Sequence, residues 1–224
     1  MTTDVNTYYG YDFCVGGYFE MPTRDARGLL PSHLEPLEVM HDRSILAITA
    51  FHFNESEVGA YDEIVLAVVV PPMVEPGKPL PKAAFFPFIV GTNTPESRQH
   101  AIERWRLPHY MKDLEIDFAE SGDEMVVTVT DGDAKVLEMT VTEHEVRAPA
   151  GNLYECFTVD SEDRYKVNIL MEAEHNEHEE ESGSLRLYEH PMTQGLTIEE
   201  VNTYPFREEW YKQGLQTFEE LESI

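Results

Sequence analysis

Short runs of β-branched and aromatic residues alternate with polar residues along most of the chain, and turn residues separate the runs. This alternation is typical of strands with one buried face, and many short strands indicate a sheet or a barrel. The run from Ile64 to Val70 is apolar throughout and too short for a helix, so it predicts a central strand covered on both faces. Strands are predicted at residues 11–20, 44–54, 61–71, 83–91, 113–119, 124–130, 135–146, 153–159, 164–173 and 184–189.

Helical patterns are few. Residues 95–106 give the clearest one, because Thr94 can cap the first turn and a proline occupies the first helical position. Residues 22–30 predict a shorter helix. Residues 206–221 have an amphipathic pattern that predicts a third helix, interrupted by Gly214. The expected fold class is therefore mainly β with a few helices, an α+β protein.

No change of pattern divides the chain, so its 224 residues are predicted to form a single domain, 1–224. The proline-rich segment 71–82 is an internal loop, since strand patterns continue on both sides of it. The Asp-Gly-Asp triplet at 131–133 separates two alternating runs and predicts a tight hairpin turn.

Acidic residues dominate the charge, because 43 Asp and Glu stand against 16 Lys and Arg and give a formal net charge of −27. This field repels nucleic acid phosphates and anionic lipid headgroups, so neither a nucleic acid nor a membrane is an expected partner. Hydrated surface carboxylates suit a salt-rich (halophilic) cytoplasm, where screening relieves self-repulsion, and they suit an ordinary acidic protein equally well. Both interpretations stay open.

Cys14 and Cys156 are the only cysteines, too few for a disulfide framework, and we expect both to be reduced core residues. The chain does not start with basic residues followed by an apolar run, and no apolar stretch approaches the roughly 18 residues of a membrane span. A cytoplasmic location is expected. No phosphate-binding glycine loop, serine elbow or nucleotide fingerprint is present, and no cofactor is expected.

Residues 172–180 (EAEHNEHEE) are a dense run of carboxylates and imidazoles. His175 and His178 could bind a divalent metal with the neighbouring glutamates. Their spacing matches no helical metal motif, however, and the run lies between two strand patterns. We therefore predict a solvated hairpin loop here and no metal site.

Four segments occur in the order found in acetoacetate decarboxylases, which the chain resembles. They are DARGLLP (Asp25 to Pro31), GAYDE (Gly59 to Glu63), AIERWRLPHY (Ala101 to Tyr110) and SLRLYEHPM (Ser184 to Met192). The last is the most specific, and together they span most of the chain. The resemblance implies a closed, cone-like antiparallel β-barrel, usually assembled into homo-oligomers, around a buried pocket for a small keto acid.

In that family a lysine attacks the substrate carbonyl, and a second lysine in the same apolar pocket lowers its pKa. By the resemblance, Glu103 and Pro108 match the family pattern, but His109 and Tyr110 replace the two lysines. Glu63 matches the family's active-site glutamate. The resemblance therefore implies a retained pocket that lacks the Schiff-base nucleophile.

We expect Glu63, His109 and Tyr110 to be catalytic. A buried glutamate can act as acid or base, histidine titrates near neutral pH, and a tyrosine hydroxyl can donate to a developing oxyanion. The plainer alternatives are a solvated strand-end acid for Glu63 and mere space filling for the other two. The residues predicted to contact the substrate are Glu103, Trp105 and Lys112.

The leading functional hypothesis is a lyase or isomerase that acts by acid and base chemistry on a small keto acid or related carbonyl or carboxylate compound. A non-catalytic binding or accessory protein of the same fold is the first alternative. The second is a true decarboxylase that uses Lys112, which is three residues beyond His109. On a regular strand these two side chains point to opposite faces, so this alternative requires a rearranged loop.

Overall fold

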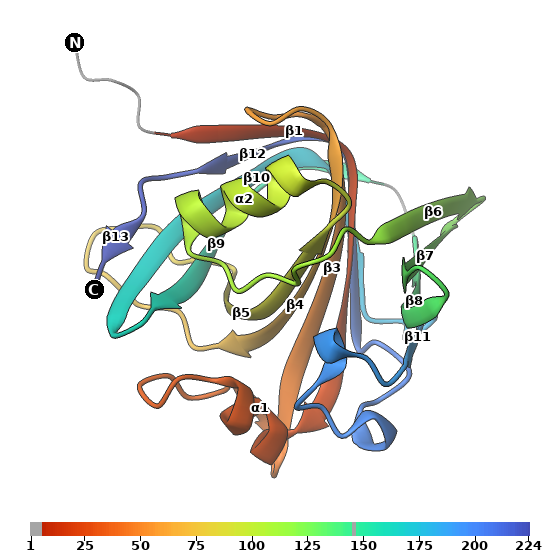
Figure 1. The fold of residues 1–224 in the computed structure, drawn as a ribbon, viewed down its shortest axis with the longest axis horizontal. Coiled ribbons are helices and arrows are strands. Elements are labelled where there is room, and N and C mark those ends of the chain that lie inside the picture. Colours follow the sequence, from red (N-terminus) through yellow and green to blue (C-terminus); the bar gives the residue numbers. More distant parts are fainter. Residues whose placement is uncertain (1–5, 145–146) are drawn as a thin grey trace.

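The computed structural model describes residues 6–144 and 147–224, and it is built mostly of strands (Figure 1). Two α-helices, α1 (Thr23–Leu29) and α2 (Pro95–Trp105), and two short 3-10 turns, η1 (Pro191–Thr193) and η2 (Ile198–Glu200), are found in this part of the chain. The strands are β1 (Thr7–Pro22), β2 (Glu38–Met40), β3 (Arg43–Glu55), β4 (Tyr61–Val70), β5 (Ala83–Thr92), β6 (Glu115–Ser121), β7 (Glu124–Asp131), β8 (Ala134–Thr142), β9 (Ala148–Asp160), β10 (Asp163–His178), β11 (Ser184–Leu187), β12 (Arg207–Phe218) and β13 (Glu222–Ser223).

The larger sheet closes into a barrel in the order β1-β12-β10-β9-β5-β4-β3, and β3 pairs with β1 to complete the ring. The closed barrel expected from the sequence is confirmed. It differs from a wholly antiparallel ring at one place, because β5 and β9 run parallel from Ala83 to Phe85 on β5. Parallel neighbours require a long crossover, and α2 with the strands β6, β7 and β8 forms that crossover here.

The second sheet, in the order β11-β8-β7-β6, covers the outside of the barrel (Figure 1). Side chains that point outward from the barrel, such as Val15, Phe19 and Trp210, share one apolar cluster with Val127 and Met139 of this sheet. A separate apolar cluster fills the inside of the barrel. The two faces of a barrel strand are therefore both buried, which explains why the strand from Ile64 to Val70 is apolar throughout.

Most local predictions agree with the structure. The predicted helices at 22–30 and 95–106 correspond to α1 and α2, and the Thr94 hydroxyl accepts a hydrogen bond from the Ser97 N–H at 3.2 Å. The Asp-Gly-Asp triplet forms the β7–β8 turn, with Gly132 at a φ of 59° that favours glycine. Both cysteines are free and buried. No helix of the described residues is long and apolar enough to cross a membrane.

The predicted helix at 206–221 is wrong, because this segment is β12, a central barrel strand. A β-bulge at Gln213 and Gly214 places two residues opposite one residue of β10. Before the bulge Glu209 and Tyr211 face the inside of the barrel, and after it Gln216 and Phe218 do. The bulge changes the parity of the inward positions, so the sequence loses the strict alternation of a strand and resembles a helical pattern.

The predicted loop at 172–180 is also wrong, because β10 continues through most of this run to His178. The strand is held on both sides, by β9 up to His175 and by β12 up to His178. Backbone pairing on both edges supports the strand, while Glu172, Glu174 and other side chains on the outer face remain exposed. A polar sequence is therefore compatible with a strand here.

Candidate functional site

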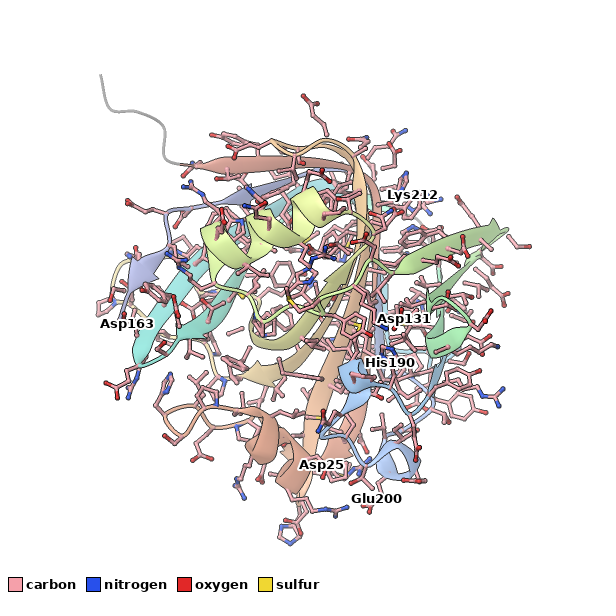
Figure 2. All side chains as sticks on the ribbon, in the orientation of Figure 1. Asp25, Asp131, Asp163, His190, Glu200 and Lys212 are labelled. Carbon is pink, nitrogen blue, oxygen red and sulfur yellow. The ribbon has the colours of Figure 1, made fainter. Side chains whose placement is uncertain are left out.

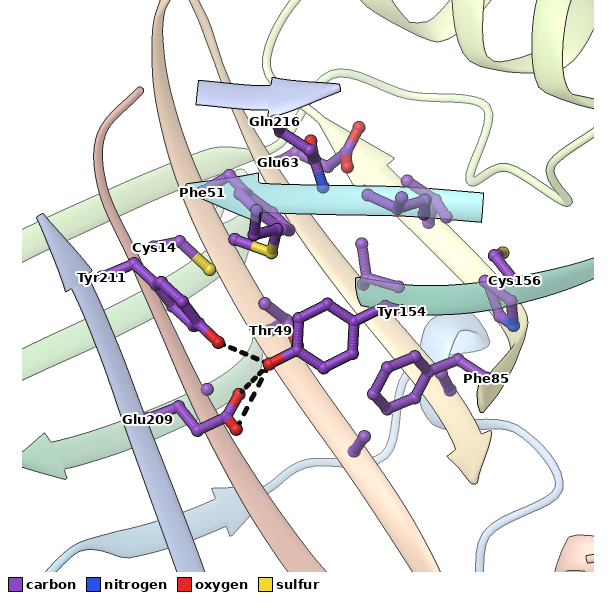
Figure 3. A pocket seen from close by; sticks show the side chains of 18 of the residues that line it. Cys14, Thr49, Phe51, Glu63, Phe85, Tyr154, Cys156, Glu209, Tyr211 and Gln216 are labelled. Carbon is purple, nitrogen blue, oxygen red and sulfur yellow. Dashed lines mark hydrogen bonds between the residues drawn. The ribbon is translucent and has the colours of Figure 1, made fainter. Parts of the chain in front are cut away.

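A cavity of about 110 Å³ lies inside the barrel, and most of the side chains around it are apolar (Figure 3). Every strand of the barrel ring contributes to the lining, as alternation along a barrel strand requires. Among the described residues, no lysine, arginine or histidine is part of this lining. The polar groups that face the cavity are Tyr18, Thr49, Glu63, Tyr154, Glu209, Tyr211 and Gln216, together with the thiols of Cys14 and Cys156.

Glu63 lies near the start of β4, opposite Phe51 of β3 and Thr92 of β5. Its side chain lines the cavity and also a small compartment of about 20 Å³ beneath α2. No hydrogen bond or ion pair of its carboxyl group is found within residues 6–144 and 147–224. Burial raises the pKa of this carboxyl from 4.5 to about 8, so Glu63 is mostly protonated at neutral pH.

Gln216 of β12 lines the same cavity and the same compartment as Glu63, and it is only 5% exposed. Figure 3 shows the two side chains at one end of the cavity. Like Glu63, the Gln216 amide has no hydrogen-bond partner in the described parts of the chain. Two buried polar side chains without partners are costly unless a ligand or water completes their bonds.

Glu209 lines the same cavity, but its carboxylate, unlike that of Glu63, is bonded by several donors. The hydroxyls of Tyr18 and Tyr154 donate to its carboxylate at 3.2 and 3.1 Å, and the Lys82 ammonium donates to it at 2.7 Å. Tyr211 bonds to the Tyr154 hydroxyl (Figure 3), and the Asn152 amide donates to Tyr211 at 2.7 Å. Burial raises the pKa of all three tyrosines, so their hydroxyls stay protonated and can donate.

Lys82, in the loop before β5, is the lysine nearest to this network. Its ammonium group bridges Glu209 at 2.7 Å and Glu177 at 2.6 Å, and it lies 5.9 Å from the centre of the Tyr154 ring. Lys82 does not line the cavity. Both carboxylates already engage the ammonium group, so this lysine is a structural cation and lacks the surroundings that activate an amine nucleophile.

His175, Glu177 and Glu209 bring three potential ligand atoms within 4.8 Å of one another. The His175 ring stacks on Tyr211 with ring centres 4.1 Å apart, whereas His178 bonds to the Thr142 carbonyl at 2.8 Å. The two histidines therefore do not converge. Lys82 already neutralises the two carboxylates, which leaves this group poorly suited to a divalent metal.

Leu107 separates the inside of the barrel from the outside. It follows α2, and Arg106 before it ends the helix in a left-handed conformation with a φ of 57°. Leu107 lines the cavity, the compartment beneath α2 and an outer groove of about 440 Å³. This groove lies beside Phe86 and Val159, past the last parallel pair of β5 and β9, where the barrel wall opens.

His109 does not reach the cavity. It forms an isolated bridge with Val90 on β5, its Nδ1 lies 2.6 Å from the Tyr110 carbonyl, and its Nε2 lies 3.4 Å from the Thr92 hydroxyl. Burial lowers the pKa of His109. Its link to Glu63 is indirect, through Thr92, which is opposite Glu63 in the β4–β5 pair.

Tyr110 and Lys112 meet outside the barrel on Asp131 of β7 rather than at Glu63. The Tyr110 hydroxyl and the Lys112 ammonium bond to the same Asp131 oxygen at 2.6 and 2.7 Å. His190 lies 3.6 Å from that oxygen, and Figure 2 shows Asp131 and His190 side by side near the second sheet. The Lys112 side chain is 66% exposed. The loop rearrangement that would bring this lysine into the pocket is absent.

Glu103 and Trp105 lie on opposite faces of α2. Glu103 is exposed and accepts a hydrogen bond from Gln99 at 2.9 Å, one turn earlier in the helix. Trp105 is buried, donates from its indole nitrogen to the Tyr9 hydroxyl at 2.7 Å, and lines the compartment beneath α2 together with Glu63. Of the two, only Trp105 borders a space where a ligand could bind.

Of the six residues singled out by sequence, the structure therefore brings only Glu63 and Trp105 to the cavity or its end compartment. Sequence reasoning missed Gln216 and Glu209 because it assigned their segment to a helix. The available signal was the cluster of large aromatic residues around Trp210, which is more typical of a strand buried on both faces. It missed Lys82 because a proline-rich loop gives no indication of what it contacts.

Comparisons with known proteins establish the fold. No family model matches the chain, and no curated protein matches it significantly. Among solved structures, acetoacetate decarboxylase from Legionella pneumophila superimposes with a TM-score of 0.69 at 13% identity, over 97% of this chain and 87% of that one. An acetoacetate decarboxylase-like enzyme from Sphingomonas wittichii gives 0.63 at 12% identity, over 100% and 94% of the two chains.

The enduracididine biosynthesis enzyme MppR, in a structure with bound pyruvate, gives a TM-score of 0.62 at 12% identity, over 100% of this chain and 91% of that one. A second ligand complex of MppR is covered over 90% of its chain. Likeness at this identity concerns the fold and not the activity. The chain has the acetoacetate decarboxylase fold.

Proposed function

We propose that this protein binds a small keto acid or related carbonyl compound in the barrel cavity and moves a proton on it through Glu63, without a Schiff base. The observation that supports the proposal best is a carboxyl group with a pKa of about 8 that faces the mostly apolar cavity inside the barrel and has no partner in the described residues. Pyruvate, a small keto acid, is bound in the structure of MppR, which has the same fold.

The proposed chemistry is enolisation, the step that lyases and isomerases of carbonyl compounds share. The ionised fraction of Glu63 accepts a proton from the carbon next to the carbonyl group, and the electron pair of that C–H bond forms the C=C bond of an enolate. The Gln216 amide donates a hydrogen bond to the oxygen that gains negative charge. Hydrogen exchange results when the proton on Glu63 exchanges with solvent before one returns to the same carbon, and return of the proton to a different carbon is an isomerisation.

The remaining predicted residues receive other roles in this proposal. His109 is a positioning residue that acts through Thr92, since its Nε2 lies 3.4 Å from that hydroxyl and the cavity lining does not include it. Tyr110 and Lys112 belong to the ion cluster at Asp131. A decarboxylase that uses Lys112 is not proposed, because its ammonium group is exposed and paired.

The experiment is hydrogen exchange of the substrate in D₂O, followed by proton NMR of the hydrogens next to the carbonyl group of butanone. Catalysed exchange is expected with the wild-type protein, with a rate that rises as pH increases toward 8, because ionised Glu63 is the base. Glu63→Gln should abolish it, while His109→Phe should keep the pH profile. A covalent adduct after borohydride treatment with pyruvate, detected by intact mass, would contradict the absence of a Schiff base.

A binding protein without catalysis is the second candidate. It is favoured by one observation: the other titratable groups near Glu63 already have partners, since Glu209 is held by Lys82 and two tyrosines, and His100 in the compartment beneath α2 lies 2.6 Å from the Tyr9 hydroxyl. Ligand-dependent thermal stabilisation that is lost in Glu63→Gln, together with no exchange above the uncatalysed rate, would establish this candidate over the first.

A further inference from the structure

Among the described residues, the cavity lining contains carboxyl groups and no cationic side chain. Glu63 and Glu209 both face it, and none of the described lining residues is a lysine, arginine or histidine. An ionised carboxylate that enters such a cavity loses its hydration and finds no opposite charge. The donors that remain for it are neutral and include the protonated Glu63 carboxyl, the Gln216 amide and the Thr49 hydroxyl.

The nearest cation is not available to a ligand. Lys82 is already bonded to Glu209 at 2.7 Å and to Glu177 at 2.6 Å. The Tyr154 ring lies 5.9 Å from the Lys82 ammonium group and itself lines the cavity, whereas Lys82 does not. An anionic ligand would have to displace Glu209 from Lys82 and leave that carboxylate buried without its ion pair.

The charge of the whole molecule also disfavours an anionic ligand. A formal net charge of −27 produces a negative field that repels small anions and leaves uncharged molecules unaffected. This effect is independent of the lining, because it depends on residues spread over the whole chain. Local and global electrostatics therefore both select against an anion.

The size of the cavity limits the ligand further. An apolar cavity of about 150 Å³ can hold benzene, which has six heavy atoms. The cavity here is about 110 Å³. It therefore suits a molecule of about four to six non-hydrogen atoms, with one oxygen directed to Glu63 and Gln216 and a hydrocarbon part against the apolar wall.

From these observations we infer that the ligand is an uncharged carbonyl compound, a small ketone, aldehyde or dione, and that a keto acid binds only as its neutral acid. This inference rests on the proposed function, because it assigns the ligand to the same cavity and to the same two polar residues. It specifies the substrate class that the proposed function left open between carbonyl and carboxylate compounds.

The test compares pairs of probes that have the same shape and differ in charge. 2,3-Butanedione and pyruvate are one pair, and acetone and acetate are a smaller pair that contains no dione able to modify arginine. Dissociation constants are measured by NMR titration at about pH 6.5, where Glu63 remains protonated. We expect each neutral probe to bind at least roughly tenfold more tightly than its anionic partner.

A change of pH adds a second measurement. Lowering the pH from about 6.5 to about 5.5 increases the neutral fraction of pyruvate roughly tenfold, so its apparent affinity should rise by about the same factor. The affinity for butanedione should stay constant. An anion that binds as tightly as its neutral partner, or a pyruvate affinity that does not depend on pH, would overturn the inference.

Introducing a cation should reverse the preference. Gln216→Lys places an ammonium group beside the cavity, and Gln216→Met is the matched neutral control. The lysine variant should gain affinity for pyruvate relative to butanedione, while the methionine variant should weaken both probes alike. If thermal unfolding shows that the lysine variant does not fold, the comparison of probe pairs on the wild-type protein decides alone.

The outcomes separate this inference from the proposed function. If none of the four probes binds or stabilises the protein, the proposed function itself fails. If both members of each pair bind equally, the cavity is the ligand site but the selection for uncharged ligands is wrong. Preference for the neutral members supports both.

Discussion

Two glutamates face the same barrel cavity in opposite chemical surroundings. Glu209 of β12 is surrounded by donors, with Lys82, Tyr18 and Tyr154 all within 3.2 Å of its carboxylate oxygens. Glu63 of β4 has no such partner in the described residues, and burial raises its pKa to about 8. The comparison shows that burial alone does not identify a functional carboxylate. Under the proposed function the absence of partners distinguishes the two glutamates, because the unmade bonds of Glu63 would be completed by a ligand.

The largest expected effect is at the unpartnered glutamate. Between pH 4.5 and 8 the folded protein keeps a proton on Glu63 that the unfolded chain releases, so this residue makes the folded state less stable as pH rises. The full cost, reached above the folded-state pKa, is about 5 kcal/mol at most. Glu63→Gln should therefore stabilise the protein by several kcal/mol at about pH 8 and by little at about pH 4.5.

The measurement is the free energy of unfolding in urea as a function of pH for the variant and the wild-type protein. Glu103→Gln is the matched control, since this glutamate lies on the exposed side of α2. Its substitution should change the free energy of unfolding little, because surface substitutions usually have small effects. If the Glu63→Gln difference does not change with pH, Glu63 ionises normally and its distinction from Glu209 disappears.

The paired glutamate should behave in the reverse way. Lys82→Met removes the ion pair of a carboxylate that is 6% exposed, and the unpaired charge should destabilise the fold. We expect a loss of about 2 kcal/mol, below the roughly 3–5 kcal/mol of a fully buried pair, because Lys82 keeps some contact with solvent. Urea unfolding at neutral pH measures the loss.

Two controls sharpen this second prediction. Lys78→Met removes an exposed lysine from Glu75 and should leave stability unchanged within error. Adding Glu209→Gln to Lys82→Met removes the buried charge but keeps an acceptor for the tyrosines, so part of the lost stability should return. Without any recovery, the Lys82–Glu209 pair cannot be what stabilises this end of the cavity.

The two glutamates also differ in whether the sequence predicted them as residues of the site. Glu63 was found because it opens an apolar strand and matches a family pattern, both of which are local properties of the chain. Glu209 and Gln216 were missed because the bulge at Gln213 shifts the inward positions of β12 by one residue. A bulge depends on the pairing of β12 with β10, which the chain alone does not specify.

The same distinction explains the other differences. α1, α2 and the β7–β8 turn depend on caps, a proline and a glycine within a few residues, and all three were predicted. The positions of His109 and Lys112 depend on where the chain goes after α2, and that path is fixed by pairing of His109 with Val90 and by bonds to Asp131. Spacing along the sequence contains no information on these distant contacts.

The smallest expected effect concerns which end of the cavity solvent reaches first. The two cysteines are natural probes, because both line the cavity, and burial raises the pKa of both thiols, that of Cys156 to about 12. Among the carboxyl groups, Glu209 acts most strongly on the Cys14 thiol and Glu63 acts most strongly on the Cys156 thiol. The thiols therefore report on the two ends separately.

If the barrier at Leu107 controls access, Leu107→Ala should increase the rate at which methyl methanethiosulfonate modifies Cys156 several-fold, with a smaller increase for Cys14. Rates are followed by intact mass in Cys14→Ser and Cys156→Ser backgrounds, so that each thiol is observed alone. Comparing the modification rate of the same thiol with and without Leu107 cancels the intrinsic reactivity of that thiol, so the ratio reports on access alone.

Leu34→Ala is the control, since this leucine packs on the outer core and lines none of these spaces. Equal acceleration of both thiols would mean that the cavity opens as a whole. Unchanged rates would instead place the entrance elsewhere and leave Glu63 no closer to solvent than Glu209.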